Sequence, residues 1–570
     1  MEQTKLTGYP SIDKPWLKYY SEEEVAAYPP KKTVVKNIYD ANKSHPYDTA
    51  LLYFGRKITY RTLFTKVDEA AKAFLAYGVK CGDNVAICLP AIPEAIYAIL
   101  GLNKIGANAN MLNPTFEADQ LTARIFESNA EVLVVLQELY GRLACIIPQT
   151  KVKTVISCPA VNSLGLLAKL FKKKNVESDT ISWKTFIRNG KDTALSEVQY
   201  IEDHPAITVY SSGTTGASKG IQLTNDSINW AIVENTPKTY GFERGKRYFL
   251  QIPIWFSTGI VTTGLVPLYY GVSLILEPMY DFTLFQKHIT KYKPNYIITA
   301  ASLVEYLMKV DNTNQLGKNW ICLAIGGEYA PPKMEERVNK WLKRCGNEHI
   351  LRKGYGMCEC GGSSVTSQVV CNVLGTAGVP TPHVTIASFD LITEKERGYN
   401  QRGELRVITP CRMLCYYNRI EETKKRLHTD TDGNTWVCTG DMGFVSEDGN
   451  ITVCGRISDS YTNEKNETIY LFDIERAVLD IDGVRQCKAI TFKQDQKTTH
   501  LCHLVLSDGA DIETILHSIK AHCIEALPKS YRPMIFHVYD DALPVAPSGK
   551  LDIAKMRNDV DNLIIIESDN

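Results

Sequence analysis

The feature that most constrains the fold is an alternation of strand-like and helix-like segments through the first half of the chain. Residues 84–89 and 131–136 are apolar runs of strand length, and residues 59–78 and 93–103 carry helical patterns. The alternation continues in strand-like runs at 207–210, 273–276 and 296–299 and in helical patterns at 225–234 and 282–292. Strands that alternate with helices predict parallel βαβ units.

The second half of the chain has a different texture. Between about residues 375 and 455, short apolar runs are separated by turn residues, which predicts a small and mostly β subdomain. A helix is expected at 471–480, and the final stretch of about 110 residues is long enough for a separate α+β domain. The sequence therefore predicts an α/β protein, with two βαβ subdomains and a β-rich subdomain in a large N-terminal domain and a smaller α+β domain after it.

The charge balance excludes some classes of partner. Lysine and arginine together number 64, as do aspartate and glutamate, so no overall field favours nucleic acid or an anionic membrane surface. The N-terminal residues lack a signal-peptide pattern, and the most apolar stretch, 85–102, is interrupted by Pro90, Pro93 and Glu94. These features predict a cytoplasmic protein with no membrane span and no nucleic-acid partner.

The sharpest local signal is a loop of small residues, Tyr210-Ser-Ser-Gly-Thr-Thr-Gly-Ala-Ser-Lys-Gly220, which we expect between an apolar strand and a following helix. Its glycines let backbone N–H groups approach an anion, its hydroxyls add donors, and Lys219 adds charge. The spacing does not fit a Walker A motif, which argues against an ordinary P-loop kinase or GTPase. Taken alone, the segment is either a phosphate-binding loop or a flexible Ser/Gly-rich turn.

The loop resembles the phosphate-binding signature of the superfamily of AMP-forming acyl-CoA synthetases, luciferases and adenylation domains. Four further segments are similar to signatures of that superfamily and stand in its order: Tyr355-Gly-Met-Cys-Glu359, Thr439-Gly-Asp441, Gly455-Arg456 and Pro544-Val-Ala-Pro-Ser-Gly-Lys550. Together these segments cover nearly the whole chain. The segments at 15–20, 57–60 and 102–107 further resemble long-chain acyl-CoA synthetases.

The resemblance implies an enzyme that uses ATP and Mg²⁺ to activate a carboxylic acid as an acyl-AMP and passes the acyl group to coenzyme A. It implies three catalytic residues: Thr214 holds phosphate, Glu359 binds the metal, and Lys550 bridges the acyl carboxylate to ribose and phosphate oxygens. Trp255 and Phe256, in a segment similar to the family's acyl-pocket strand, would shape the acid pocket. The implied nucleotide-binding set is Ser211, Ser212, Gly213, Thr214, Thr215, Gly216, Lys219, Gly327, Glu328, Tyr355, Gly356, Cys358, Asp441, Arg456 and Lys550.

The resemblance also implies how the chain is divided and how the nucleoside is held. A large AMP-binding domain would span residues 1–455, a hinge 456–459, and a mobile C-terminal lid carrying Lys550 would span 460–570. Tyr355 would stack on adenine, Asp441 would accept hydrogen bonds from the ribose hydroxyls, and Arg456 would donate to ribose or phosphate.

Three departures from the family pattern bear on function. Cys358 stands where the pattern has threonine, and a thiol is a weaker hydrogen-bond donor than a hydroxyl, which would weaken the α-phosphate contact. Lys353 stands where the family often has Glu, Gln or Asn near adenine, and no role for it follows from the sequence. In the loop 457–469, Asn466 aligns with a family glycine near the pantetheine channel. Asparagine tolerates left-handed backbone better than most residues, so the turn can persist.

Three functions are compatible with these residues. The first is a fatty or aryl acid–CoA ligase. The second is an acyl-AMP ligase that loads a carrier-protein phosphopantetheine, which the unusual loop 457–469 allows. The third is a non-catalytic, nucleotide-gated acyl-binding protein, against which the presence of Lys550, Glu359 and Asp441 argues. Trp255 and Phe256 suit an alkyl chain or a ring equally well, so the acid itself is not determined.

Overall fold

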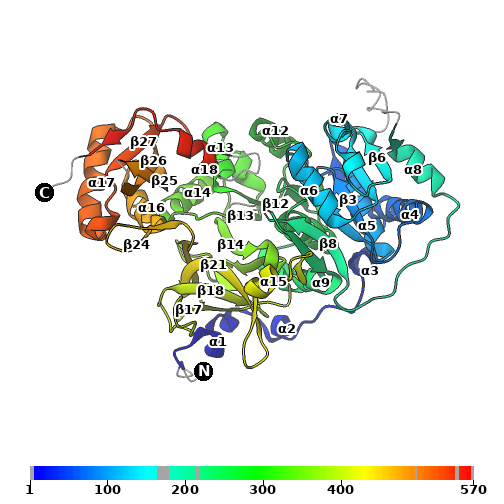
Figure 1. Ribbon diagram of the computed structural model, residues 1–570, viewed down its shortest axis with the longest axis horizontal. Coiled ribbons are helices and arrows are strands. Elements are labelled where there is room, and N and C mark those ends of the chain that lie inside the picture. The colour runs from blue at the N-terminus through cyan, green and yellow to red at the C-terminus, as the bar shows by residue number, and fades with distance from the viewer. Residues whose placement is uncertain (1–5, 164–178, 212–217, 495–496, 546–550, 567–570) are drawn as a thin grey trace.

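The computed structural model describes residues 6–163, 179–211, 218–494, 497–545 and 551–566, and it confirms the predicted α/β class (Figure 1). One part of the molecule is built on a largely parallel sheet, the first sheet. Among the described residues this sheet has eight strands, in the order β19-β9-β8-β4-β3-β5-β6-β7. They are β3 (Asn84–Cys88), β4 (Asn108–Met111), β5 (Val132–Leu136), β6 (Thr154–Cys158), β7 (Ile181–Ser182), β8 (Pro205–Tyr210), β9 (Gly220–Thr224) and β19 (Cys415–Tyr416).

Helices cover both faces of the first sheet. Side chains alternate between the two faces along each strand, so successive apolar residues of one strand pack against helices on opposite faces. Val85 and Ile87 of β3 belong to the core that includes α4 (Tyr60–Ala76) and α5 (Pro93–Lys104). Ala86, which points to the opposite face, belongs to the core that includes α6 (Ala118–Ser128). The predicted elements α4, β3, α5 and β5 end within two residues of their expected limits. None of the described helices combines the length and apolar character needed to cross a membrane.

A second sheet, also mainly parallel, is covered on one face by α12 (Phe282–Tyr292), α13 (Ala301–Val310) and α14 (Pro332–Arg344). In the described part of the chain it has nine strands, in the order β16-β15-β14-β13-β12-β10-β11-β1-β2. They are β1 (Thr49–Tyr53), β2 (Arg56–Thr59), β10 (Arg247–Leu250), β11 (Ser273–Leu276), β12 (Tyr296–Thr299), β13 (Cys322–Gly326), β14 (Arg352–Met357), β15 (Gly362–Thr366) and β16 (Val379–Pro380).

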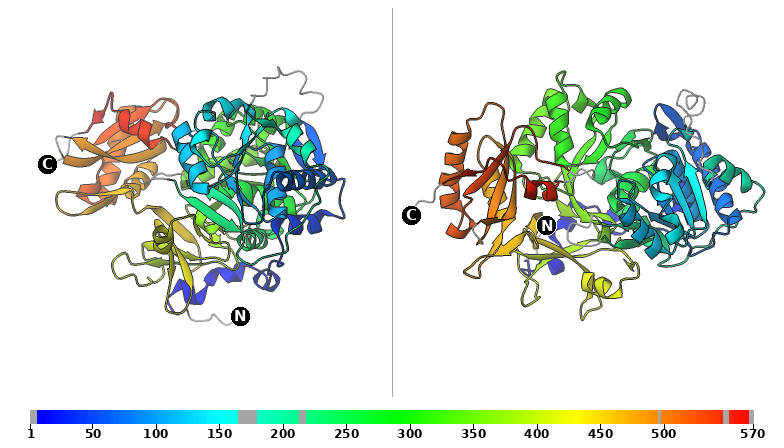
Figure 2. Two further views of the ribbon diagram at one scale, coloured as in Figure 1. Left: turned by 45° about the vertical axis from the view of Figure 1, so that its right-hand side comes forward. Right: turned by 45° about the horizontal axis from the view of Figure 1, so that its top comes forward.

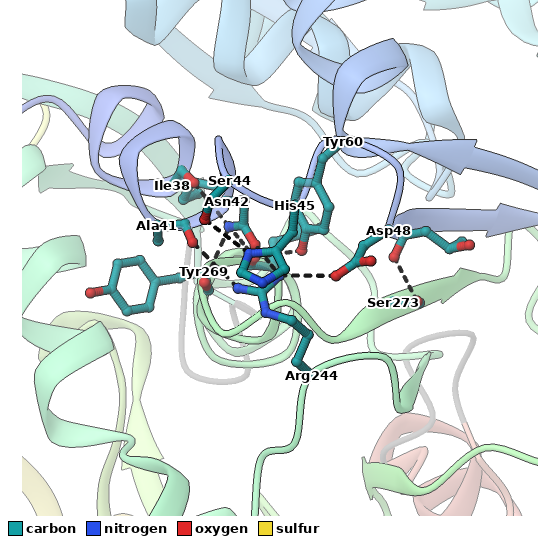
Figure 3. Close-up of polar contacts among 12 residues, drawn as sticks. Ile38, Ala41, Asn42, Ser44, His45, Asp48, Tyr60, Arg244, Tyr269 and Ser273 are labelled. Carbon is teal, nitrogen blue, oxygen red and sulfur yellow. Dashed lines mark hydrogen bonds and ion pairs between the residues drawn. The ribbon is translucent and has the colours of Figure 1, made fainter.

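A polar cluster around Asn42 and Arg244 ties the N-terminal segment to this second sheet (Figure 3). Asn42 ends α3 (Val34–Asn42) and donates from its side-chain nitrogen to the Leu268 carbonyl oxygen at 3.1 Å. Arg244 donates to the side-chain oxygen of Asn42 at 3.0 Å and to the carboxylate of Asp48 at 3.3 Å. These contacts hold the segment that leads into β1, which pairs in parallel with β11.

Two smaller units follow in the chain. The β-rich subdomain is an antiparallel sheet of β17 (Thr385–Phe389), β18 (Gly403–Ile408), β20 (Leu427–Thr429), β21 (Thr435–Val445) and β22 (Ile451–Arg456). The C-terminal unit lies at one end of the molecule (Figure 2) and has its own apolar core. Its elements are β23 (Ser460–Thr462), β24 (Thr468–Tyr470), α16 (Leu471–Leu479), β25 (Val484–Gln494), β26 (Lys497–Leu506), α17 (Ile512–Ala526), β27 (Ile535–Tyr539), α18 (Ile553–Asn558) and β28 (Ile564–Ile565).

The expected setting of the loop at 210–220 is wrong in one respect. The loop is followed by strand β9, which pairs antiparallel with β8, and not by a helix. The helix α9 (Asn225–Glu234) begins only after this strand. The reason is that 220–224 is a fully buried segment in the sheet, so its backbone groups are satisfied by β8 and β19. No helix N-terminus therefore directly follows the loop.

Candidate nucleotide site

The predicted phosphate loop begins at the edge of the first sheet where ligands bind in parallel α/β proteins. Its parent strand β8 runs parallel to β4, so the carboxyl ends of the two strands are neighbours. The backbone N–H of Ser211 donates to the Lys219 carbonyl at 3.1 Å, and the Lys219 N–H donates to the Ser211 hydroxyl at 3.1 Å. These two predicted residues therefore close the base of the loop. The predicted residues that lie outside the described part of the chain are Ser212, Gly213, Thr214, Thr215, Gly216 and Lys550.

Glu359, the predicted metal ligand, is brought close to Lys219 by a tyrosine. The Glu359 residue is 6% exposed, and the Tyr416 hydroxyl donates to its carboxylate at 2.6 Å. The ammonium nitrogen of Lys219 lies 4.8 Å from the centre of the Tyr416 ring, which is cation–π distance. Tyr416 belongs to β19 and pairs with Ile221 of β9, just beyond the loop. One aromatic side chain therefore contacts both a buried carboxylate, through its hydroxyl, and a lysine, through its ring.

Glu359 offers the oxygen ligand that a hard cation such as Mg²⁺ prefers. In the part of the chain that the structure describes, no cluster of three or more His, Cys, Asp and Glu side chains is suited to a metal ion. A magnesium ion at Glu359 would take its other ligands from nucleotide phosphates and water, as Mg²⁺ commonly does. The residues present are compatible with a metal that arrives with the nucleotide.

Tyr355, Asp441 and Arg456 meet where β14 approaches the strand pair β21–β22. The Tyr355 hydroxyl donates to one oxygen of the Asp441 carboxylate at 2.7 Å, and the Arg456 Nε lies 3.1 Å from the other oxygen. Asp441 is 5% exposed, and burial raises its pKa, although Arg456 and Tyr355 oppose that shift. The structure therefore brings three predicted nucleotide-binding residues together, with Tyr355 and Arg456 in contact with the buried carboxylate of Asp441.

The other predicted residues of this region shape the backbone. Gly327 has a φ of 80°, a conformation that favours glycine. The Glu328 carboxylate accepts the Ala301 N–H at 3.1 Å, so its side chain is held at the start of α13. A Cβ atom at Gly356 would overlap the Gly362 carbonyl oxygen, because β14 and β15 approach closely at an irregularity in their pairing. Cys358 begins the short 3₁₀ turn, Cys358–Cys360, that carries Glu359.

Lys353, to which the sequence assigns no role, forms a buried ion pair. Its ammonium nitrogen lies 2.6 Å from the carboxylate of Glu335 on α14, and the two side chains are 5% and 1% exposed. Lys353 also donates to the Val373 carbonyl at 2.7 Å, and Glu335 accepts the Gly375 N–H at 2.8 Å. The pair therefore joins β14, α14 and the segment 373–375 behind Tyr355.

The predicted acyl-pocket residues do not lie on a strand, which corrects that expectation. Trp255 and Phe256 lie in a turn that leads into a π-helix, Thr258–Leu265. The reason is a tight backbone contact, since a Cβ atom at Gly259 would overlap the Pro253 carbonyl oxygen. Trp255 is partly buried and packs against the main core. The π-helix contacts β15, so this segment lies next to the strand pair that carries Tyr355. π-Helical turns occur often at functional sites.

The unusual loop after Arg456 forms a hairpin of β23 and β24. Asn466 has a φ of 58°, so it adopts the left-handed conformation for which the family uses glycine. The Asn463 side-chain oxygen accepts the backbone N–H groups of Lys465 and Glu467 at 2.9 and 3.0 Å. The two asparagines therefore define the turn.

Two contributors to the site are not identified by the sequence reasoning, Tyr416 and Arg426. Arg426 ends α15 (Ile420–Arg426) and donates from Nε to the Tyr416 hydroxyl at 3.1 Å. Burial raises the pKa of Tyr416, and the carboxylate of Glu359 acts in the same direction. The available signal is that Tyr416 lies in a short apolar run, 413–417, before a turn. That pattern carries no information about a contact with Glu359.

Curated proteins of known activity are similar to this chain over most of its length. The long-chain-fatty-acid–CoA ligase of Bacillus subtilis (strain 168) is 26% identical over 522 residues, which cover 88% of this chain and 90% of that protein. The 2-succinylbenzoate–CoA ligase of Oceanobacillus iheyensis is 24% identical over 499 residues, which cover 87% of this chain and 93% of that protein.

Solved structures share the fold. The anthranilate CoA ligase AuaEII in complex with anthranoyl-AMP superposes with a TM-score of 0.79 at 19% identity, covering 93% of this chain and 97% of that one. ATP-bound MatB from Rhodopseudomonas palustris superposes with a TM-score of 0.78 at 20% identity, covering 93% and 99%. A profile of the AMP-binding enzymes matches residues 38–417, which is more than half of the chain. The resemblance found in the sequence is confirmed, and the chain belongs to the family of AMP-binding enzymes.

Proposed function

We propose that the protein is an ATP-dependent acid–CoA ligase that activates a fatty acid as its acyl-AMP and transfers the acyl group to coenzyme A. The observation that carries the proposal is a pair of buried carboxylates: Glu359, which Tyr416 connects to Lys219 at the base of the phosphate loop, and Asp441, which Tyr355 and Arg456 contact. The choice of a fatty acid is supported by the long-chain-fatty-acid–CoA ligases among the relatives.

In the first half-reaction, a carboxylate oxygen of the acid forms a bond to the α-phosphorus of ATP. The bond between the α-phosphorus and the oxygen that bridges to the β-phosphorus breaks, and pyrophosphate leaves. Both reactants are anions, so stabilisation of negative charge is the main task of the protein. Thr214 and Lys219 hold phosphate oxygens, and Lys550 bridges the acyl carboxylate and the nucleotide. Glu359 would hold magnesium, which would supply positive charge to the phosphates.

The nucleoside is positioned by the cluster around Asp441. The ribose hydroxyls donate to the Asp441 carboxylate, and they take the place of the Tyr355 hydroxyl, which lies 2.7 Å away in the structure. This exchange frees the Tyr355 ring to stack on adenine. Arg456 favours the charged form of the carboxylate, because its guanidinium opposes the effect of burial, which raises the Asp441 pKa.

In the second half-reaction, the thiolate sulfur of coenzyme A attacks the acyl carbonyl carbon, a thioester forms and AMP leaves. We propose that residues 460–570 turn as a lid about a hinge at 456–459 between the two steps. Ion pairs between exposed side chains join the C-terminal unit to α13 and α14, such as Lys309 with Asp541 at 2.5 Å, where the side chains are 55% and 71% exposed. Exposed pairs contribute roughly 0–1 kcal/mol each, so they can break during such a movement.

A carrier-protein phosphopantetheine is the second candidate acceptor, because the loop 457–469 departs from the family pattern. The left-handed conformation of Asn466 preserves the turn that the family glycine makes, which supports thioester formation with either acceptor. The CoA ligases among the relatives favour coenzyme A.

The test is pyrophosphate release with ATP, magnesium and pools of fatty and aryl acids, with and without coenzyme A. Lys550→Ala is the negative control. We expect acid-dependent turnover that coenzyme A stimulates and that the variant loses. A single turnover without stimulation by coenzyme A would favour the carrier protein, and acid-independent release of phosphate in place of pyrophosphate would refute the ligase assignment.

A further inference from the structure

Arg426 differs from its basic neighbours on α15. Lys424 and Lys425 are exposed, whereas Arg426 is partly buried and turns toward the site. Its Nε donates to the Tyr416 hydroxyl at 3.1 Å, and Nη1 donates to the Cys438 carbonyl oxygen. The side chain therefore spans from the residue that holds Glu359 to the strand that carries Asp441.

The guanidinium of Arg426 lies between the two carboxylates of the site, those of Glu359 and Asp441. On one side, Tyr416 connects it to Glu359 through two hydrogen bonds. On the other side, Nη1 approaches Gly440, the residue before Asp441: a Cβ atom at Gly440 would lie 4.0 Å from it. In the proposed reaction Asp441 holds ribose and Glu359 faces the metal and the outer phosphates. The group that links ribose to the outer phosphates is the α-phosphate.

The charge of Arg426 is not neutralised by an ion pair. Within the described residues, no carboxylate lies within 4.0 Å of its guanidinium nitrogens. A guanidinium has five N–H donors in a planar fork that matches an oxyanion. Two of its nitrogens serve Tyr416 and Cys438, and these two contacts use only part of that capacity. Glu359 and Asp441 act on this charge only from a longer distance, so the unused N–H donors of the guanidinium remain available to an anion at that point.

We propose that Arg426 binds the α-phosphate of the nucleotide and offsets the weak donor at Cys358. Charge-assisted hydrogen bonds from a guanidinium are stronger than bonds from a thiol, so Arg426 would supply the stabilisation that the family takes from a threonine hydroxyl. The inference rests on the proposed function, since it assumes that ribose binds at Asp441.

The test compares AMP with adenosine, which differ only by the phosphate. Isothermal titration of the full-length wild type, Arg426→Met and Arg426→Lys measures both ligands, and Lys424→Met serves as the matched control from the exposed face of α15. We expect Arg426→Met to bind AMP roughly 10- to 100-fold more weakly, with adenosine affinity unchanged. Arg426→Lys should lie between Met and wild type, and Lys424→Met should match wild type.

Equal losses for AMP and adenosine in Arg426→Met would show a structural role, and unchanged AMP affinity would show no phosphate contact; either result overturns the proposal. If Arg426→Met does not fold, Arg426→Lys decides, because a lysine cannot reproduce the planar fork and should still weaken AMP selectively. The binding data need no acid substrate. A selective loss of AMP affinity in a protein without ligase activity would therefore keep the phosphate contact and refute only the proposed function.

Discussion

Replacing Lys353 with methionine should destabilise the protein far more than an ordinary lysine substitution. The change leaves the carboxylate of Glu335, 1% exposed, without its cation. Breaking a buried pair by removing one partner costs about 3–5 kcal/mol. We expect the lower end, about 3 kcal/mol, because the Gly375 N–H still donates to Glu335. Burial raises the pKa of Glu335, so the stranded carboxyl would also take up a proton more readily.

The double variant Lys353→Met/Glu335→Leu separates the charge effect from packing. It removes both charges and leaves the Gly375 N–H without its acceptor, a loss of about 1–3 kcal/mol. The Val373 carbonyl stays satisfied, since Thr376 donates to it at 2.9 Å. The double variant should therefore be no less stable than Lys353→Met, although it carries a second core substitution.

Urea unfolding followed by tryptophan fluorescence and circular dichroism measures these differences. Lys343→Met is the matched control, because Lys343 is an exposed lysine on the same helix as Glu335, and it should change the free energy of unfolding by less than about 0.5 kcal/mol. The single variant Glu335→Leu completes the comparison. The argument that the pair is a coupled buried contact is refuted by a loss below about 1 kcal/mol for Lys353→Met. It is also refuted if the loss of the double variant equals the sum of the losses of Lys353→Met and Glu335→Leu.

Three further predictions concern single contacts. Tyr416→Phe removes the hydroxyl that holds Glu359 and should lower kcat roughly 10-fold, with a stability loss of about 1–3 kcal/mol because the buried carboxylate loses a donor; an unchanged kcat in pyrophosphate release would contradict this role. Gly356→Ala places a methyl group on the Gly362 carbonyl and should cost about 1–3 kcal/mol in thermal unfolding; a wild-type melting temperature would show that the two strands can separate there. Burial lowers the pKa of His383, but the Glu234 carboxylate, 2.6 Å from Nδ1, outweighs it and raises that pKa above 6.5. The interaction of protonated His383 with Glu234 contributes fully to stability below pH 6.5, and this contribution is lost as the pH rises through the raised pKa of His383. The difference in unfolding free energy between wild type and His383→Asn should therefore shrink as the pH rises from about 6 to about 9, and a constant difference would contradict the ion pair.

The elements that the sequence predicts well are those whose signal is local. Helix α4 and strand β3 follow from apolar spacing within their own residues, and both end within two residues of the prediction. The strand β9 is missed because its role depends on β8 and on β19, which lies almost 200 residues later in the chain. A run of five residues carries too little periodicity to reveal such a pairing.

In the candidate site too, residues within a local motif are predicted, whereas contacts between distant parts of the chain are not. Glu359, Asp441 and Arg456 are identified by motif resemblance, and the structure places Asp441 and Arg456 as cross-strand partners. The contacts of Arg426 are not predicted, because they depend on where α15 ends relative to Tyr416. Lys353 is identified as unusual, but its partner Glu335 lies on a different element, and their contact forms only when α14 packs on the second sheet.

The most direct test of the central claim is ATP–pyrophosphate exchange without coenzyme A, with labelled pyrophosphate and the pools of fatty and aryl acids. Formation of an acyl-AMP is reversible, so the proposed enzyme should return label to ATP only when its acid is present, and Lys550→Ala should not. Label that enters ATP at the same rate without any acid, or an acid-dependent release of ADP and phosphate in place of exchange, would contradict adenylate formation.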